Sequence, residues 1–81
     1  MLHRALTEGV QLVERGERDP AVVRAQLRAT IGAEPRAELD YAEVVRAGDL
    51  SVPDTLSGEL RLLVAARFGR ARLIDNRGVT I

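Results

Sequence analysis

Apolar positions recur with helical spacing at the start of the chain. They fall three or four residues apart, which is the spacing of one face of an α-helix. The pattern predicts an amphipathic helix over residues 2–15 that ends near Gly16. The apolar face of this expected helix consists of Leu2, Ala5, Leu6, Gly9, Val10 and Val13, and the other face carries Arg4, Glu8, Gln11 and Arg15.

A second helix is predicted directly after a short polar connection. Asp19 followed by Pro20 is typical of an N-cap with proline in the first turn. Val23, Leu27 and Ile31 then recur every four residues, and Gly32 is the expected C-cap. Because only a few residues separate the two helices, we expect an antiparallel helical hairpin whose apolar side packs on another element.

The spacing changes to alternation after Pro35. Residues 37–46 are predicted to form a strand, although Glu43 interrupts its apolar face. Residues 48–59 have loop composition around Leu50 and Val52. Residues 60–68 are nearly all apolar and read as a central strand covered on both faces. Gly69-Arg70 is a candidate two-residue turn, residues 71–75 form the returning strand, and residues 76–78 are expected to break it.

These elements predict an α+β fold in a single domain over residues 1–81. The helical hairpin should cover one face of a three-stranded, mainly antiparallel sheet. A chain of 81 residues can bury one core. A 46% apolar content and zero formal net charge favour a packed globule over a disordered segment or a general polyanion binder.

Composition also limits the chemistry. The chain has no Cys and a single His, so we expect neither disulfides nor a thiolate- or His-based metal site. The longest apolar run, residues 62–66, is far shorter than the roughly 20 residues that span a bilayer. We therefore expect no membrane span, and a cytoplasmic location.

No catalytic residue emerges from the sequence. His3 lies near the chain start without a Ser or Asp placed to complete a triad, and we expect it on the surface. Asp40 and Glu43 lie on one strand but should point to opposite faces, so they cannot converge on one substrate atom. No glycine-rich phosphate loop is present.

An arginine cluster is the one candidate binding feature. If Gly69-Arg70 forms the turn, Arg67 lies directly across from Arg72, where like charges repel. Two interpretations follow. In the first, a carboxylate such as Asp40 or Glu43, or screening by solvent, relieves the repulsion. In the second, the pair holds a phosphate or carboxylate ligand that Arg70 helps to bind.

The second half of the chain carries a family resemblance. The segments LLVAARFG (62–69) and RLIDN (72–76), preceded by DYAEVV (40–45), resemble the C-terminal domain of the pantothenate synthetases, also called pantoate:β-alanine ligases. The opening LHRAL resembles the helix that begins this domain. The chain departs from the family at Ala71, where threonine is common, and at Arg77, where a small or apolar residue often stands. The family's N-terminal nucleotide-binding domain has no counterpart here.

The resemblance implies a role in a two-domain ligase. The family joins pantoate to β-alanine with ATP and Mg²⁺ through a pantoyl adenylate, and it releases AMP and pyrophosphate. It is cytoplasmic and typically dimeric through the N-terminal domain, which would be this chain's partner. The C-terminal domain resembles a lid over the cleft. Since the ligands of the family lie mainly in the missing domain, we expect this chain to bind no cofactor and to be inactive alone, and any contribution to the cleft would come from the turn Arg67–Arg72.

Two other functions remain open at this point. The first is a small anion- or nucleic-acid-binding module that uses Arg67, Arg70, Arg72 and Arg77. Zero net charge and only one Tyr and one Phe for base stacking argue against nucleic acid. The second is an interaction domain that self-associates through an unpaired sheet edge.

Overall fold

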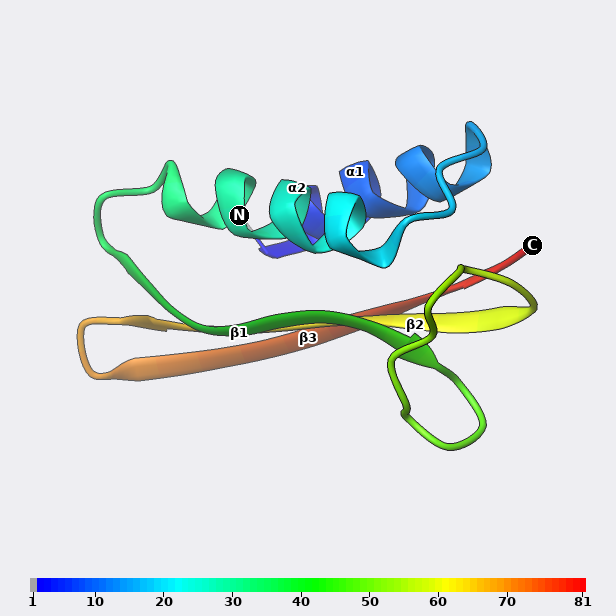
Figure 1. The fold of residues 1–81 in the computed structure, drawn as a ribbon. Coiled ribbons are helices and arrows are strands. Elements are labelled where there is room, and N and C mark those ends of the chain that lie inside the picture. The colour runs from blue at the N-terminus through cyan, green and yellow to red at the C-terminus, as the bar shows by residue number, and fades with distance from the viewer. Residues whose placement is uncertain (1) are drawn as a thin grey trace.

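A computed structural model describes residues 2–81, which form two helices and three strands in the order α1 (Leu2–Glu14), α2 (Pro20–Gly32), β1 (Ala37–Arg46), β2 (Glu59–Phe68) and β3 (Ala71–Thr80). The strands form one antiparallel sheet in the order β1-β2-β3. Both helices lie in one layer on the same side of this sheet (Figure 1). The predicted fold, a helical hairpin on one face of a three-stranded sheet, is confirmed.

The helix ends follow the local sequence signals closely. Gly16, two residues after the end of α1, has φ of +112°, a positive value that glycine adopts without steric cost. The Asp19 side chain accepts a hydrogen bond from the Ala21 amide at 2.9 Å and so caps α2. The expectation of a glycine cap at the other end is wrong. Gly32 is the last helical residue, and Ala33 caps the helix in a right-handed conformation through its own N–H.

The core lies between the helices and the sheet. It takes the apolar stripes of both helices and every second residue of β2, because successive side chains of a strand point to opposite faces. Leu62 lies against Gly9 of α1, which places the even-numbered residues of β2 on the helix side. The fully buried large side chains are Leu6, Val13, Val23, Leu27, Ile31, Val44, Leu56, Leu60, Leu62 and Val64.

The third strand is longer than expected. It pairs with β2 without interruption from Phe68–Ala71 to Glu59–Thr80, so the predicted break over residues 76–78 is wrong. The guanidinium of Arg61 on β2 lies beside Gly78 and donates to the Asn76 side chain at 3.2 Å. A full-length partner strand therefore sustains the ladder through residues whose own β-propensity is low.

A β-bulge interrupts the first strand between Leu39 and Tyr41. Leu39 pairs with Ala66 and Tyr41 pairs with Ala65, so Asp40 is the extra residue without a partner of its own on β2. Bulges re-aim side chains. Here the result is that the Asp40 carboxylate reaches the arginines of β2 and β3.

Leu56 anchors the loop between β1 and β2. Leu50 and Val52, the apolar residues noted in the sequence, are exposed, whereas Leu56 is fully buried. The Leu56 amide donates to the Arg18 carbonyl in the α1–α2 connection at 2.8 Å. The loop is thus tied to the helical layer at one point.

One face of the sheet stays free of helices (Figure 1). Tyr41, Ala65 and Ile74 are register partners that form a row across this open face. Ala65 is buried, whereas Tyr41 is 39% and Ile74 59% exposed. The prediction that β2 is central is confirmed, but the prediction that both of its faces are covered is wrong.

Candidate functional site: the arginine pair and the helical groove

Arg67 and Arg72 face each other across the β2–β3 hairpin, as the sequence predicted. Asp40 lies between them. Its Oδ2 accepts a hydrogen bond from Arg72 Nε at 2.7 Å, and its Oδ1 lies 3.7 Å from Arg67 Nε. The carboxylate that one interpretation required is therefore supplied by β1, through the bulge at Asp40.

The charges of this cluster support one another. The hydrogen bond from Arg72 lowers the pKa of Asp40 below its ordinary value, against the opposing effect of partial desolvation, and the charge of Arg67 adds to the lowering. The same bond raises the pKa of Arg72. Asp40 is thus ionised at neutral pH and offsets part of the repulsion between the two guanidinium groups. A ligand anion would have to compete with it.

Arg70 stands apart from this pair. It lies at the turn beside Gly69, whose φ is +62°, and within residues 2–81 its side chain makes no hydrogen bond or ion pair. The structure therefore brings together two of the three predicted anion-binding residues and leaves Arg70 exposed at the tip of the hairpin. A hollow of about 570 Å³ at this end is lined by Arg36, Phe68 and Gly69.

Glu43, the other carboxylate considered for the arginine pair, has a different partner. Its Oε1 accepts from Arg24 Nε of α2 at 2.8 Å, so this ion pair fastens the edge strand β1 to the helical layer. Asp40 and Glu43 do not share a site. The expectation that they point to opposite faces is wrong, because the bulge turns Asp40 toward Arg72 on the face that, by the strand register, also holds Glu43; they are kept apart by their different partners.

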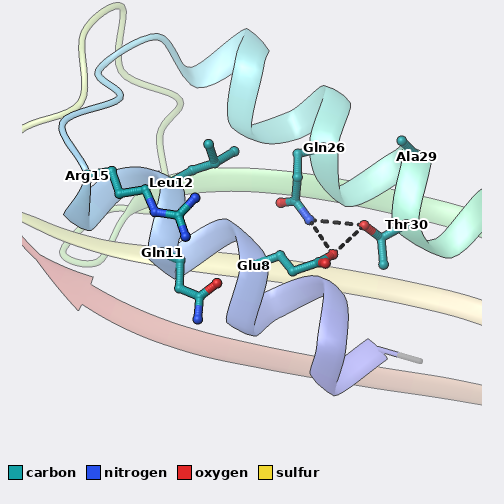
Figure 2. Close-up of a pocket in the computed structure, with 7 residues that line it drawn as sticks. All are labelled: Glu8, Gln11, Leu12, Arg15, Gln26, Ala29 and Thr30. Atoms are coloured by element: carbon teal, nitrogen blue, oxygen red, sulfur yellow. Dashed lines mark hydrogen bonds between the residues drawn. The ribbon is translucent and has the colours of Figure 1, made fainter.

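A second polar site lies in the groove between the two helices (Figure 2). Thr30 donates to Glu8 Oε1 at 2.7 Å, and Gln26 Nε2 lies 3.3 Å from the same oxygen and 3.1 Å from the Thr30 hydroxyl. The hydrogen bond from Thr30 is the main cause that lowers the pKa of Glu8. The groove measures about 450 Å³ and also includes Gln11 and Arg15.

The sequence contained a signal for this groove. Glu8, Gln11 and Arg15 follow helical spacing on the polar face of α1, and Gln26 and Thr30 are four residues apart on α2. The sequence did not show that the two stripes face each other. That juxtaposition depends on the angle at which the helices pack, which only the tertiary structure sets.

No catalytic constellation is present in the described part of the chain. His3 is exposed on α1. Residues 2–81 contain no group of three or more His, Cys, Asp or Glu side chains placed to hold a metal ion. Within the same residues, no helix has the length and apolar character needed to cross a membrane.

Comparison with known proteins gives the family. The family model described as Pantoate-beta-alanine ligase matches residues 1–78. The chain belongs to this family. Pantothenate synthetase 2 of Frankia alni is 51% identical over 80 residues, covering 99% of this chain, and pantothenate synthetase of Geobacillus kaustophilus is 47% identical over 75 residues, covering 93%.

Solved structures of the pantoate-beta-alanine ligase family have the same fold. The crystal structure of pantothenate synthetase from Thermus thermophilus superposes with a TM-score of 0.89 at 30% identity and covers 99% of this chain. The chain spans 24% and 25% of the length of the two curated relatives and 29% of the solved chain. It corresponds to the C-terminal region of the family, as the motifs in its sequence indicated.

Proposed function

We propose that this chain is the lid domain of a pantothenate synthetase, a ligase that condenses pantoate with β-alanine at the expense of ATP. One observation carries the proposal: sequence and fold match the family over 99% of this chain, but only over about a quarter of the relatives. The remaining part of such an enzyme would bind ATP, Mg²⁺, pantoate and β-alanine. The assembled enzyme would be a cytoplasmic homodimer.

The chemistry of this chain favours a supporting role over a catalytic one. The described residues include no acidic cluster suited to Mg²⁺. The sequence contains no glycine-rich phosphate loop. The residues therefore do not fit an ATP–Mg²⁺ site, and we assign no chemical step to them. We propose that the chain is inactive by itself.

A lid would still matter for the reaction. An acyl adenylate is destroyed when water reaches it, so closure of a domain over the cleft protects the reactive species and positions groups around it. The two arginines beside Asp40, together with Arg70, would be cationic groups near the tip of the β2–β3 hairpin.

The open face of the sheet is the surface that we assign to the nucleotide-binding domain. Tyr41 and Ile74, which flank the buried Ala65, expose apolar side chains there, and exposed apolar patches commonly mark an interface between domains. This face has no helical layer within the described residues (Figure 1). When the lid docks on the nucleotide-binding domain, that domain would cover these side chains.

A complementation experiment tests the proposal. This chain is mixed with the separately expressed N-terminal domain of pantothenate synthetase from Geobacillus kaustophilus, and AMP release is followed with ATP, pantoate and β-alanine present. We expect the mixture to release AMP faster than the N-terminal domain alone, and this chain alone to release none. A covalently linked version repeats the assay at high effective concentration. No increase in either format would overturn the lid function.

A pair of variants then locates the docking face. Ile74→Arg places a charge on the open face and should remove the increase, whereas Val22→Arg makes the same kind of change at an exposed position of α2, on the other layer. Because both residues are already exposed, neither change should alter the free energy of unfolding by more than about 0.5 kcal/mol. An unaffected Ile74→Arg mixture would move the interface to another face.

A further inference from the structure

The outer edge of β3 is a long unpaired strand. β3 pairs with β2 on one side only, and within residues 2–81 no strand lies on its other side. Ten residues from Ala71 to Thr80 make up this edge, and all but Asp75 and Val79 are exposed. An edge of this kind presents N–H and C=O groups that can pair with another strand; at its centre the Asn76 N–H now donates to Asp75 Oδ1 and would exchange that bond on pairing.

The sequence of this edge is complementary to itself. Around Asn76, Asp75 is mirrored by Arg77, Ile74 by Gly78, and Leu73 by Val79. An acid therefore mirrors a base, an apolar residue mirrors an apolar residue, and the most exposed large apolar side chain of the edge mirrors a glycine. An antiparallel strand pair with Asn76 at its centre would place each of these residues directly opposite its mirror partner.

The two charges at the centre of the pattern have no charged partner of their own. Within the described residues, neither Asp75 nor Arg77 belongs to an ion pair, and the ion pairs that do form lie elsewhere. Asp75 Oδ1 accepts only from the Asn76 amide, at 2.8 Å, and Arg77 Nη1 donates to the Thr7 hydroxyl of α1 at 2.8 Å. Both charges are available to an oppositely charged neighbour.

The side chains that would meet in this pairing lie on the same face of the sheet in both copies. Leu73, Asp75, Arg77 and Val79 pair with Ala66, Val64, Leu62 and Leu60, the residues of β2 that face the helices. In an antiparallel pair, residues directly opposite share a face. The acid–base pairs and the Leu73–Val79 contacts would therefore lie on the helix side of the sheet, next to α1, whose Thr7 contacts Arg77.

We propose that two copies of this chain associate through β3, antiparallel and in register at Asn76, to form a continuous six-stranded sheet. The interface is two-fold symmetric: Asp75 of one copy meets Arg77 of the other, and the same contact occurs twice. Leu73 of each copy packs on Val79 of the other. This association goes beyond the lid function and does not depend on it.

Charge reversal tests the register directly. Asp75→Arg gives a chain with two basic residues beside Asn76, and Arg77→Glu gives a chain with two acidic ones, so each variant meets like charges in its own homodimer. Arg28→Glu makes the same charge change as Arg77→Glu at an exposed position of α2 and is the matched control. Circular dichroism is used to check that every variant keeps the fold of the parent.

Sedimentation equilibrium measures the association at chain concentrations up to about 1 mM. We expect the parent and Arg28→Glu to dimerise alike, and each of the two central variants to show a dissociation constant raised about ten-fold or more. An equimolar mixture of Asp75→Arg and Arg77→Glu should dimerise again, because both acid–base pairs are restored across the mixed interface. Added salt should weaken this mixed dimer.

Three results would overturn the proposal. The parent chain could remain monomeric over the whole concentration range. A dimer could form with the same affinity in the parent and in both central variants, as it would if the open face of the sheet were the interface. The mixture could also fail to recover association although both folded variants have lost it, which would exclude the register at Asn76.

Discussion

Gly9 is the tightest point of the interface between α1 and the sheet. A methyl group added at this position would lie 2.6 Å from Leu62 Cδ2, 3.1 Å from Gln26 Oε1 and 3.2 Å from Leu27 Cδ2. The first distance is well below ordinary contact between carbon atoms. Leu62 and Leu27 are both fully buried, so either side chain would have to displace other core atoms in order to move away.

Two effects of Gly9→Ala oppose each other. Alanine in a helix interior is favoured over glycine by about 1 kcal/mol, which would stabilise α1. Forcing an extra methyl into a packed core costs about 1–3 kcal/mol. Because the closest contact is with a buried side chain, we expect the upper half of that range to apply and the variant to be destabilised by about 1–2 kcal/mol. For a domain of this size, that corresponds to a fall in Tm of about 5–15 °C.

Urea unfolding followed by circular dichroism measures the effect, with Gly32→Ala as the control. Gly32 is also helical, but no atom lies within 4 Å of the methyl that alanine would add. Gly32→Ala should therefore be neutral or stabilising by up to about 1 kcal/mol. The two glycine-to-alanine changes should thus have opposite signs, or differ by more than about 1 kcal/mol.

A double-mutant cycle with Leu62→Ala tests the cause. Leu62→Ala alone should cost about 2–5 kcal/mol because it leaves a cavity. In the Gly9→Ala background the added methyl occupies part of that space, so the second change should cost at least about 1 kcal/mol less. A Gly9→Ala chain as stable as Gly32→Ala, with additive effects in the cycle, would refute the idea that this helix approaches the sheet as closely as the structure indicates.

Three further predictions concern the ion cluster and the helix cap. Asp40→Asn should lower the free energy of unfolding at neutral pH, because Arg67 and Arg72 lose their carboxylate. Since folding lowers the pKa of Asp40, the difference between parent and variant should have its full size above the ordinary pKa of Asp and should vanish as both proteins are acidified below about pH 4. Urea unfolding across pH measures this difference. Arg67→Ala should have a smaller effect than Asp40→Asn, because it removes the 3.7 Å contact and the repulsion from Arg72 together; an equal loss in the two variants would contradict this. Asp19→Ala should destabilise the chain by about 1 kcal/mol in thermal unfolding, since the Ala21 amide loses its acceptor, and Asp19→Ser should restore most of the loss.

The sequence alone determined the order of the elements and the apolar faces of the two helices. The apolar stripe of α1, the Asp19–Pro20 start of α2 and the Gly69-Arg70 turn depend on local periodicity and on backbone preferences, and each of them lies where it was predicted. The opposition of Arg67 and Arg72 followed from the turn alone, because a two-residue connection fixes the register of a hairpin. The family motifs could also be recognised from the sequence alone.

Contacts between elements distant in sequence were decided only by the tertiary structure. The strand β3 continues through Asn76 and Gly78 because β2 is long enough to pair with it, although the local residues favour a break. Asp40 reaches both arginines because a bulge shifts β1 by one residue, and no pattern of alternation contains such a shift. Gly9 was visible in the sequence as part of an apolar stripe. Its close approach to Leu62, however, depends on how near the helix packs to the sheet. That distance is a property of the assembled core and not of any one segment.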